Sequence, residues 1–545
     1  MLRFRQPKIE SAKQTPQWLV ILQDALPTIT DGEAVSIDQI LLVGDIWLSN
    51  RQALLAELND CPSNATDAEI VARLWQIHAI ATPLKLQGMF AFYVYDSSRR
   101  QGWLVRDSSG SRTIYYSDKT AGARLRNVAS SLSKRTVDLV ALRDYLCCAF
   151  VPDKRTLLKG ICEVRPGTLV EFPQGKEHIY WQIEERVTAQ GQLQWHAERL
   201  RKLLEQVISE YLPQDEDVGV YLSGGIDSSA VTALAKLLHH KPVHTYSIHF
   251  GTETPNELKF SSLVAEHCQT KHTIIEITPQ QMWQLLPQTM SILDDPIGDP
   301  LTVPNLILGQ DAAKTCKVIL NGEGGDPCFG GPKNQPMLLR QLYSANHRSE
   351  VEDYLTSFQK CSDDLPHLLK PDIYQQVKQE SYFFEEDLKI EASYLNKLMF
   401  INTKYKGADH ILTKVNNITS ELGLSGRSPL FDRRVVELSL EIPPEFKLQG
   451  AREKAVLKAA VADLLPEAIL NRPKSGMMVP VQLGFRKYWN KPARDLLLDK
   501  KALIYDYLQP SLIKAWLDYR GDLWSRYGVK LWLIASLEYW LRANL

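Results

Sequence analysis

The stretch Val218-Gly-Val-Tyr-Leu-Ser-Gly-Gly-Ile-Asp-Ser-Ser229 decides the fold of the larger, C-terminal part of this chain. Its apolar beginning is typical of a buried parallel strand, and the two glycines that follow allow a tight turn and a close approach of the backbone to a ligand. A helix is expected from Asp227 to His239. Because the start of a helix carries unpaired N–H groups and the positive end of the dipole, we expect this loop to bind the phosphates of a nucleotide.

A phosphate site with an aspartate in it also needs a cation. Asp227 would repel phosphate unless Mg²⁺ lay between them, so we interpret it as a metal ligand. The loop lacks the Gly-Lys-Ser/Thr ending of a Walker A motif. It resembles instead the Ser-Gly-Gly-x-Asp-Ser loop of ATP pyrophosphatases, which release pyrophosphate and transfer AMP to an oxygen of the substrate. The alternative is an ordinary turn between strand and helix, which would need the two glycines but not the whole string.

Composition narrows the class of protein. A chain of 545 residues is too long for one compact core, and we expect two domains. With 63 basic and 64 acidic residues the net charge is −1, which gives no general attraction to nucleic acid or to an anionic membrane. The eight cysteines include no Cys-x-x-Cys pair, and no apolar run approaches the ~20 residues of a membrane span. We therefore expect a cytoplasmic protein that binds neither nucleic acid nor membrane.

Strand and helix patterns alternate in the expected second domain, residues 196–545. After the loop they are strand Val243–Ile248, helix Asn256–Cys268, strand His272–Ile277, helix Thr278–Leu293 and strand Val318–Leu320. This order predicts an α/β fold with a doubly wound parallel sheet, whose ligand lies at the carboxyl ends of the strands. Asn321-Gly-Glu-Gly-Gly-Asp326 follows the last strand directly, so its two carboxylates should face the same site as Asp227.

The first 190 residues form the other expected domain and are rich in strand patterns. The short β-branched and aromatic runs are Ile40–Trp47, Met89–Tyr95, Gly102–Arg106 and Thr113–Tyr116. Two helices, Asn50–Leu58 and Asp67–Ile77, interrupt them, the second behind a Thr66 cap. A sandwich of sheets with helices on the outer faces is the economical arrangement.

Several strings in this first domain resemble the asparagine synthetase family. Leu86–Asp96, Val105–Gly110 and Tyr145–Pro152 are similar to its glutaminase domain, as the Ser-Gly-Gly loop is to its synthetase domain. The resemblance implies an αββα sandwich of the Ntn-hydrolase type, followed by a parallel sheet of the adenine-nucleotide α-hydrolase type. It thus covers almost the whole chain.

On this interpretation, residues 1–190 lack the groups that carry out the glutaminase chemistry of that family. Those enzymes hydrolyse glutamine with an N-terminal cysteine, whereas Met1 is followed here by Leu2 and the first cysteine is Cys61. The segments that hold glutamine are also missing, and Val43-Gly44-Asp45 stands where an Asn-Gly-Glu segment is expected. We predict that residues 1–190 have no glutaminase activity, although they could still hold a substrate or a partner.

The resemblance also implies roles for individual residues. ATP would contact Leu222, Ser223, Gly224, Gly225, Asp227, Ser228, Ser229, Ile248, Asn321 and Gly322. Asp227 and Asp326 would hold Mg²⁺, Glu323 would lie near the acyl group, and Lys474 would neutralise the charge that develops in the transition state. Asp295, Asn416 and Arg427 would shape the substrate pocket.

Four departures from the family pattern set expectations about the substrate. Pro327 replaces an acid after Asp326, so the magnesium site could be built differently. Asp295 shortens an expected glutamate by one methylene, while Asn416 stands for an aspartate and Ser425-Gly426 for an acidic or small pair, so that the pocket loses charge where the family grips a small charged substrate. These changes favour a substrate other than aspartate.

The sequence therefore predicts a synthetase that adenylates a carboxylate and captures it with an amine. Without glutaminase the amine is either free ammonia or part of the substrate, as in the branches that close β-lactams or the macrolactam ring of lasso peptides. We favour the lasso-type branch, because the β-lactam branch has a tyrosine where Glu323 stands. A leader peptidase or precursor-binding protein would then be a partner. A tRNA-modifying enzyme and an inactive nucleotide-binding scaffold are the rivals from other classes.

Overall fold

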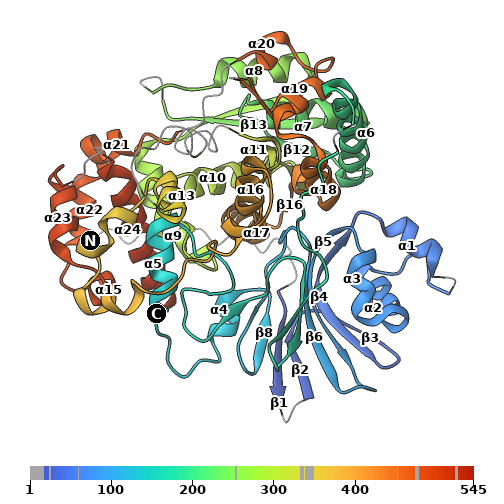
Figure 1. Ribbon diagram of the computed structural model, residues 1–545, viewed down its shortest axis with the longest axis horizontal. Coiled ribbons are helices and arrows are strands. Elements are labelled where there is room, and N and C mark those ends of the chain that lie inside the picture. Colours follow the sequence, from blue (N-terminus) through green and yellow to red (C-terminus); the bar gives the residue numbers. More distant parts are fainter. Residues whose placement is uncertain are drawn as a thin grey trace.

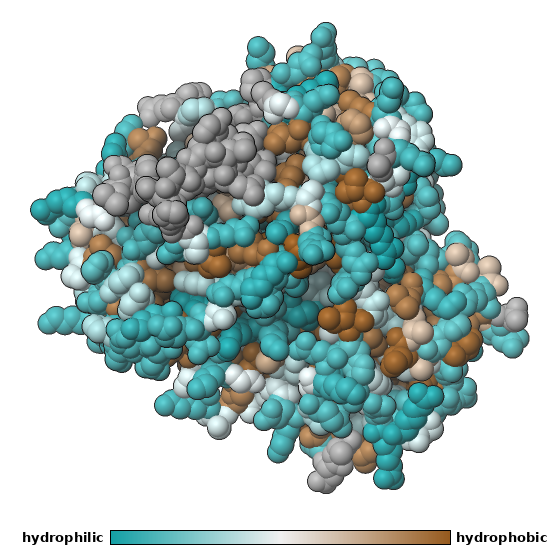
Figure 2. Space-filling model, viewed as in Figure 1, coloured by the Kyte–Doolittle hydropathy of each residue, from teal (hydrophilic) through white to brown (hydrophobic). Residues whose placement is uncertain are grey.

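The protein folds as two groups of sheets that lie side by side (Figure 1), in a computed structural model that describes residues 17–23, 26–58, 60–188, 190–251, 254–331, 337, 349–450, 452–472, 478–521 and 526–545. The antiparallel sheets of the N-terminal part lie at the lower right of Figure 1, and the parallel sheet with its helices lies above them. No helix in these ranges is both long and apolar enough to cross a membrane. The face in Figure 2 is mainly hydrophilic, with its apolar side chains in small separate groups.

The N-terminal part contains two antiparallel sheets. The first has the order β2 (Leu26–Asp31), β1 (Leu19–Gln23), β8 (Thr120–Gly122), β7 (Tyr115–Tyr116) and β9 (Cys162–Glu163). The second has the order β11 (Lys176–Ile179), β10 (Thr168–Phe172), β6 (Gln101–Arg106), β5 (Gly88–Asp96), β4 (Ile40–Leu48) and β3 (Ala34–Ile37). Side chains from both sheets, among them Val20 and Tyr93, share one apolar core, so the sheets pack face to face.

Helices cover the two outer faces of this sandwich. Those of the second sheet are α1 (Arg51–Glu57), α2 (Asp67–His78) and α3 (Thr82–Lys85), and α4 (Leu125–Ala129) packs on the first, while α5 (Leu139–Cys148) packs against α13 (Glu350–Phe358) and α15 (Pro371–Val377) of the C-terminal part. The expected Thr66 cap is a complete capping box with Glu69, which explains why α2 begins at Asp67. The predicted αββα sandwich is confirmed.

The C-terminal part is built on one parallel sheet in the order β14-β13-β12-β15-β16, which confirms the predicted fold class. Its strands are Lys271–Glu276, Val243–His249, Val218–Tyr221, Val318–Leu320 and Ser425–Arg427. The chain runs outward from β12 to β14 and then returns to the other side of β12. Ligands of open α/β sheets bind where the strand order reverses, at the carboxyl ends of the strands, which here is the crevice between β12 and β15.

Helices lie on both faces of this sheet. One face is covered by α6 (Leu193–Tyr211), α7 (Ile226–Leu238), α8 (Leu258–His267), α18 (Arg433–Glu441) and α19 (Ala455–Ala460). The other is covered by α9 (Pro279–Ile292), α10 (Thr302–Ala312), α17 (Thr413–Glu421) and α24 (Tyr527–Asn544). The remaining helical segments include α11 (Gly325–Phe329), α13 (Glu350–Phe358), α14 (Leu365–Leu368), α15 (Pro371–Val377), α16 (Tyr394–Ile401), the π-helical η5 (Asn402–Leu412), α20 (Glu467–Leu470), α21 (Val481–Gly484), η8 (Phe485–Trp489), α22 (Asn490–Leu497) and α23 (Pro510–Leu517).

Two local expectations were wrong in part. The apolar run from Arg452 through Leu465 is typical of a helix that begins at Arg452, but Arg452–Glu453 is strand β18, paired with β17 (Leu448–Gln449), and α19 begins only at Ala455. The Trp-rich end from Leu523 to Leu545 is typical of an amphipathic helix packed on the core; α24 is a helix in the core, but it is buried on nearly every side, including the charged Lys530 and Glu538, and so is not amphipathic. Glu538 accepts hydrogen bonds from the N–H groups of Leu503 and Ile504, so tertiary partners satisfy a charge that periodicity would place in solvent.

Candidate active site

The loop after β12 closes on itself through two serines. The Ser228 hydroxyl accepts a hydrogen bond from the Ser223 N–H (3.2 Å) and donates one to the Gly225 carbonyl (3.2 Å). Gly225 is the N-cap of α7 and lacks a side-chain cap, so the helix start leaves backbone N–H groups for a ligand. Ser229 is fully buried, and its hydroxyl has no hydrogen-bond partner within the described ranges. These features fit an anion at the start of α7.

The back of this loop is held by α8 and by Arg472. Gly224 has a φ of +79°, and a Cβ there would lie 2.5 Å from the Ser261 nitrogen. The Arg472 guanidinium donates to the Gly224 carbonyl (2.8 Å), stacks on Phe260 (4.0 Å) and pairs with Glu257. Arg472 was not foreseen, since nothing in its local sequence shows that it reaches a loop so far away in the chain. Its contacts fix the side of the loop opposite to the helix start.

Glycines in the loop after β15 let it press against the first loop. A Cβ on Gly322 would lie 2.5 Å from the Ser228 nitrogen, and one on Gly325 would collide with the Asp227 carboxylate. Gly324 has a φ of +104°, a conformation that strongly favours glycine. The dense glycines are therefore explained by close approach, and they bring Asp326 to the same place as Asp227.

Lys454 lies between these two aspartates and was missed by sequence reasoning. Its Nζ contacts Asp227 Oδ2 and lies 2.5 Å from Asp326 Oδ1, and its side chain is fully buried. Burial opposes the charge of Lys454, but attraction to Asp227 and Asp326 outweighs it and raises the pKa of Lys454. The only local signal is a lysine at the start of an apolar helical run, which does not reveal its partners.

The two aspartates suit a magnesium ion that also binds phosphate. Both contact the Lys454 ammonium, and carboxylate oxygens are the ligands that Mg²⁺ prefers. The ranges that the structure describes hold no cluster of three or more histidine, cysteine, aspartate or glutamate side chains that could bind a metal. Nucleotide oxygens and water would complete the shell. Pro327 costs no helical hydrogen bond, because it lies in the first turn of α11.

Glu323 and Ile248 lie near this site, whereas Lys474 cannot be placed. Ile248 is buried near the carboxyl end of β13, and the Glu323 N–H donates to Asn321 Oδ1 (3.0 Å). Lys414 pairs with Asp299 (3.1 Å); burial opposes the charge of Lys414, but attraction to Asp299 and then to Glu323 raises its pKa. Lys474 falls outside the described residues, and its catalytic role stays a prediction.

The three residues expected in the substrate pocket contact the N-terminal sandwich. Asp295 accepts a hydrogen bond from the Leu157 N–H (2.8 Å), and burial, with further carboxylates nearby, raises the pKa of Asp295 well above its ordinary value. The Arg427 guanidinium stacks on Trp47 (4.1 Å), and burial lowers the pKa of Arg427 to about 10. Asn416 donates to Thr113 Oγ1 (3.2 Å). Substrate contact by these residues stays a prediction.

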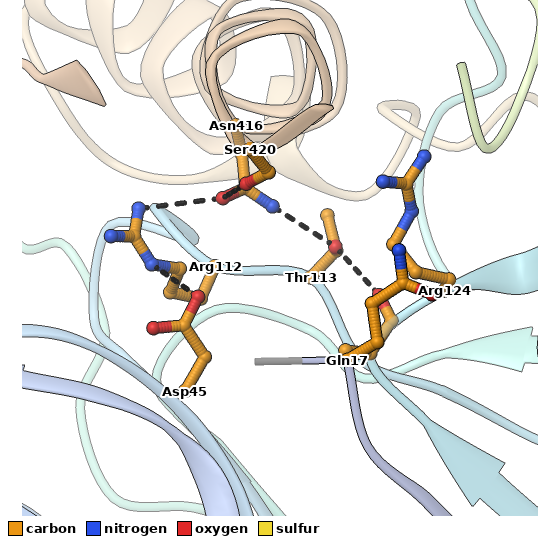
Figure 3. A pocket seen from close by; sticks show the side chains of 8 residues that line it. Gln17, Asp45, Arg112, Thr113, Arg124, Asn416 and Ser420 are labelled. Atoms are coloured by element: carbon orange, nitrogen blue, oxygen red, sulfur yellow. Dashed lines mark hydrogen bonds and ion pairs between the residues drawn. The ribbon is translucent and has the colours of Figure 1, made fainter. Parts of the chain in front are cut away.

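A small cavity lies between the two parts of the chain (Figure 3). Its volume is about 20 Å³, and it is lined by Gln17, Asp45, Arg112, Thr113, Ala123, Arg124, Asn416 and Ser420. Arg112 pairs with Asp45 (2.8 Å) and also reaches Asn416 Oδ1 (3.4 Å). Asp45 belongs to the segment Val43-Gly44-Asp45, which stands where the resemblance places a glutamine-holding segment. At this position Asp45 forms an ion pair with Arg112.

A second cavity, of about 240 Å³, opens beside the carboxyl ends of β13 and β14. Apolar and aromatic side chains such as Phe250, Met282 and Trp489 line it, and Glu276 contributes a carboxylate. This lining suits a flat apolar group with polar edges.

Comparisons with known proteins identify relatives over most of the chain. The family described as asparagine synthase matches residues 199–542, and the family described as glutamine amidotransferase domain matches residues 29–181. Asparagine synthetase (glutamine-hydrolyzing) 1 of Bacillus subtilis is 25% identical over 525 residues, which cover 88% of this chain and 81% of that protein. Carboxyethyl-arginine beta-lactam-synthase of Streptomyces clavuligerus is 26% identical over 448 residues, covering 80% and 73%. Asparagine synthetase B (glutamine-hydrolyzing) of Escherichia coli is 24% identical over 459 residues, covering 79% and 68%.

Proposed function

Because this chain belongs to the asparagine synthase family and is an ATP-dependent carbon–nitrogen ligase, we propose that it joins a carboxylate to an amine of the same substrate. The favoured product is the macrolactam ring of a lasso-type precursor peptide. A leader peptidase or a precursor-binding protein would deliver that substrate. The proposal is supported by the ion pair that fills the place of glutamine recognition and by the β-lactam synthase among the relatives.

The proposed reaction has two steps. A carboxylate oxygen attacks the α-phosphorus of ATP, and the bond to pyrophosphate breaks. The amine nitrogen then attacks the acyl carbon and loses a proton, and AMP leaves with its oxygen. The unpaired N–H groups at the start of α7 would hold the phosphates, and Glu323 would accept the proton of the amine. Asp227 and Asp326 would bind Mg²⁺, which neutralises charge on the leaving pyrophosphate.

The small cavity at Asp45 bears on where the nitrogen of the amide comes from. Its volume of about 20 Å³ is near the minimum of roughly 10–15 Å³ that a single water requires. A glutamine side chain does not fit unless the pair between Asp45 and Arg112 opens, and that pair is largely buried. This observation carries the proposal that the amine does not come from glutamine.

The cavity of about 240 Å³ supports a place for the adenine ring. Its wall begins at Phe250, two residues after Ile248, and ring faces and aliphatic groups would cover a purine on both sides. The phosphates would then point along the carboxyl ends of the strands toward the start of α7. This orientation leaves the acyl group near Glu323.

Two products of the same chemistry remain as alternatives. The Bacillus subtilis and Escherichia coli relatives favour asparagine as the product, with free ammonia as the amine if glutamine is not used, and the Streptomyces clavuligerus relative favours a β-lactam. Glu323 occupies the position at which the β-lactam branch has a tyrosine, which makes the β-lactam the weaker alternative.

The decisive experiment compares three substrate sets under Mg²⁺ and ATP. The first is a linear peptide library with free α-amines and side-chain carboxylates, the second is aspartate with ammonium, and the third is a set of β-amino acids. We expect AMP and pyrophosphate only with peptides, together with a product that has lost one water. AMP formed with aspartate and ammonium, or with β-amino acids, would replace the lasso-type proposal by the corresponding alternative.

A further inference from the structure

The backbone at Lys454 is set by a hairpin. The hairpin of β17 and β18 ends at Glu453, α19 begins at Ala455, and Lys454 between them has a φ of +55°. That left-handed conformation is uncommon for lysine. The ammonium at the end of this side chain is fully buried between two carboxylates. A buried ammonium is costly unless it is paired, so these two carboxylates are what make the charge tolerable at this place.

The two carboxylates need a cation to stay close together. Asp227 belongs to the start of α7 and Asp326 to the start of α11. Both carboxylates contact the same Lys454 ammonium, so their negative charges lie close enough to repel each other. Gly325 and Gly331 let other parts of the second loop pack directly on these carboxylates, which leaves them little room to turn away. The ammonium of Lys454 supplies the required charge at the point where both carboxylates meet.

We propose that the Lys454 ammonium occupies the metal position between Asp227 and Asp326 until Mg²⁺ and nucleotide displace it. The proposal rests on the magnesium and nucleotide site of the proposed function. An ammonium and a divalent ion cannot occupy the same point, so free Mg²⁺ must displace Lys454 to bind. The flexible stem of lysine allows that movement, and bound phosphate offers the displaced ammonium a new anionic partner. The ion should therefore enter with the nucleotide and bind poorly without it.

The test uses Mn²⁺ as a spectroscopic probe and measures its binding to the whole protein by electron paramagnetic resonance without nucleotide. We expect wild type to bind Mn²⁺ weakly and Lys454→Met to bind it at least roughly tenfold more tightly, because the competitor has gone. If Lys454 only stabilised the structure of the site, Lys454→Met would lower the affinity for Mn²⁺, because a disordered site binds the ion less tightly. Lys530→Met is the matched control. It removes another buried ammonium, which pairs with Asp364 (2.7 Å), and should leave Mn²⁺ affinity unchanged.

A second variant keeps the proposal testable where Lys454→Met does not fold. Lys454→Arg retains the cation and offers a planar fork that can hold both carboxylates. We expect Mn²⁺ affinity equal to or below that of wild type, with stability against urea near that of wild type. Tighter Mn²⁺ binding by Lys454→Arg, or unchanged or weaker binding by a folded Lys454→Met, would overturn the proposal.

Measuring Mn²⁺ binding in the presence of a nucleotide analogue tests this inference separately from the proposed function. We expect α,β-methylene ATP to raise the affinity of wild type for Mn²⁺ to at least that of Lys454→Met, because the phosphates take over the ammonium. If α,β-methylene ATP does not raise the Mn²⁺ affinity of wild type while Lys454→Met still binds Mn²⁺ more tightly, Lys454 competes with a cation at this site, but the site does not bind ATP.

Discussion

Arg112 of the N-terminal sandwich donates a hydrogen bond to Asn416 of α17 at 3.4 Å, and Thr113 accepts one from the same side chain at 3.2 Å (Figure 3). Asn416 therefore joins the two parts of the chain at the place where glutamine recognition was expected. On the same helix, Lys414 pairs with Asp299 (3.1 Å) and lies near Glu323. These contacts link the sandwich to the helix beside the candidate site.

The first prediction concerns the stability of this interface. Asp45→Ala removes one partner of a largely buried ion pair and leaves the Arg112 guanidinium without its carboxylate. We expect the free energy of unfolding to fall by about 3–5 kcal/mol, and the double variant Asp45→Ala with Arg112→Met to recover much of it. Urea denaturation measures both. As a control, Glu216→Ala breaks an exposed pair with Lys317 and should cost less than about 1 kcal/mol.

The second prediction concerns glutamine. Purified protein should release no glutamate from glutamine, with or without ATP, because the cavity at Asp45 cannot take the side chain. A coupled glutamate assay measures this, with a glutamine-hydrolysing asparagine synthetase as the positive control. Glutamate release that disappears in an Asp45 or Arg112 variant of this chain would show that the interpretation of the cavity is wrong.

The third prediction concerns the metal site. Asp326→Asn keeps the volume of the side chain and removes one charge from the proposed Mg²⁺ shell, so AMP release should fall by roughly a hundredfold or more while the fold persists. AMP formation with an active substrate and circular dichroism measure the two effects. Asp463→Asn, at an exposed position, is the control and should keep normal turnover. Normal turnover in Asp326→Asn would place the metal elsewhere.

The fourth prediction concerns Lys474. Lys474→Met keeps the apolar stem and removes the ammonium, whose proposed partners are charges that develop only in the transition states. We expect turnover to fall by roughly 10²–10³-fold while the ATP dissociation constant changes little. Calorimetric ATP binding beside AMP release separates these effects, and Lys500→Met serves as the control. Lost ATP binding in a folded variant, or near-normal turnover, would contradict the role given to Lys474.

The fifth prediction is a pH dependence of stability. Lys447 is buried and donates to Asn396 Oδ1 (2.6 Å), and burial lowers the pKa of Lys447 from 10.5 to about 7. Between these values the unfolded chain binds the proton and the folded chain does not, so stability rises with pH across this window. Below it, both states are protonated and the cost of the buried charge is fully present. The slope is at most about 1.4 kcal/mol per pH unit.

Urea denaturation at several pH values above neutrality measures this slope. Lys447→Met lacks the titrating group, so we expect wild type to gain stability relative to the variant as the pH rises. Parallel curves for the two proteins would show that Lys447 does not titrate in this window.

Local sequence determined the elements that carry the site. The strand and helix around Ser223–Ser229, the capping box of Thr66 and Glu69, and the alternation that gives the parallel sheet all follow from patterns within short windows. Such patterns suffice because backbone hydrogen bonding, capping and the burial of one face are set by residues near each other in the chain. For the same reason the glycine-rich segment after β15 could be assigned to the same edge of the sheet as Asp227.

Tertiary structure alone decided which charged side chains meet. Lys454 reaches Asp227 and Asp326 from a hairpin that was expected to be helix, and no periodic pattern marks a single charged side chain whose partners lie far away in the chain. Asn416 and Arg427 likewise have partners in the sandwich that their own segments do not reveal. A buried charge is stable only with partners of suitable geometry, and those partners come together only when the whole chain has packed.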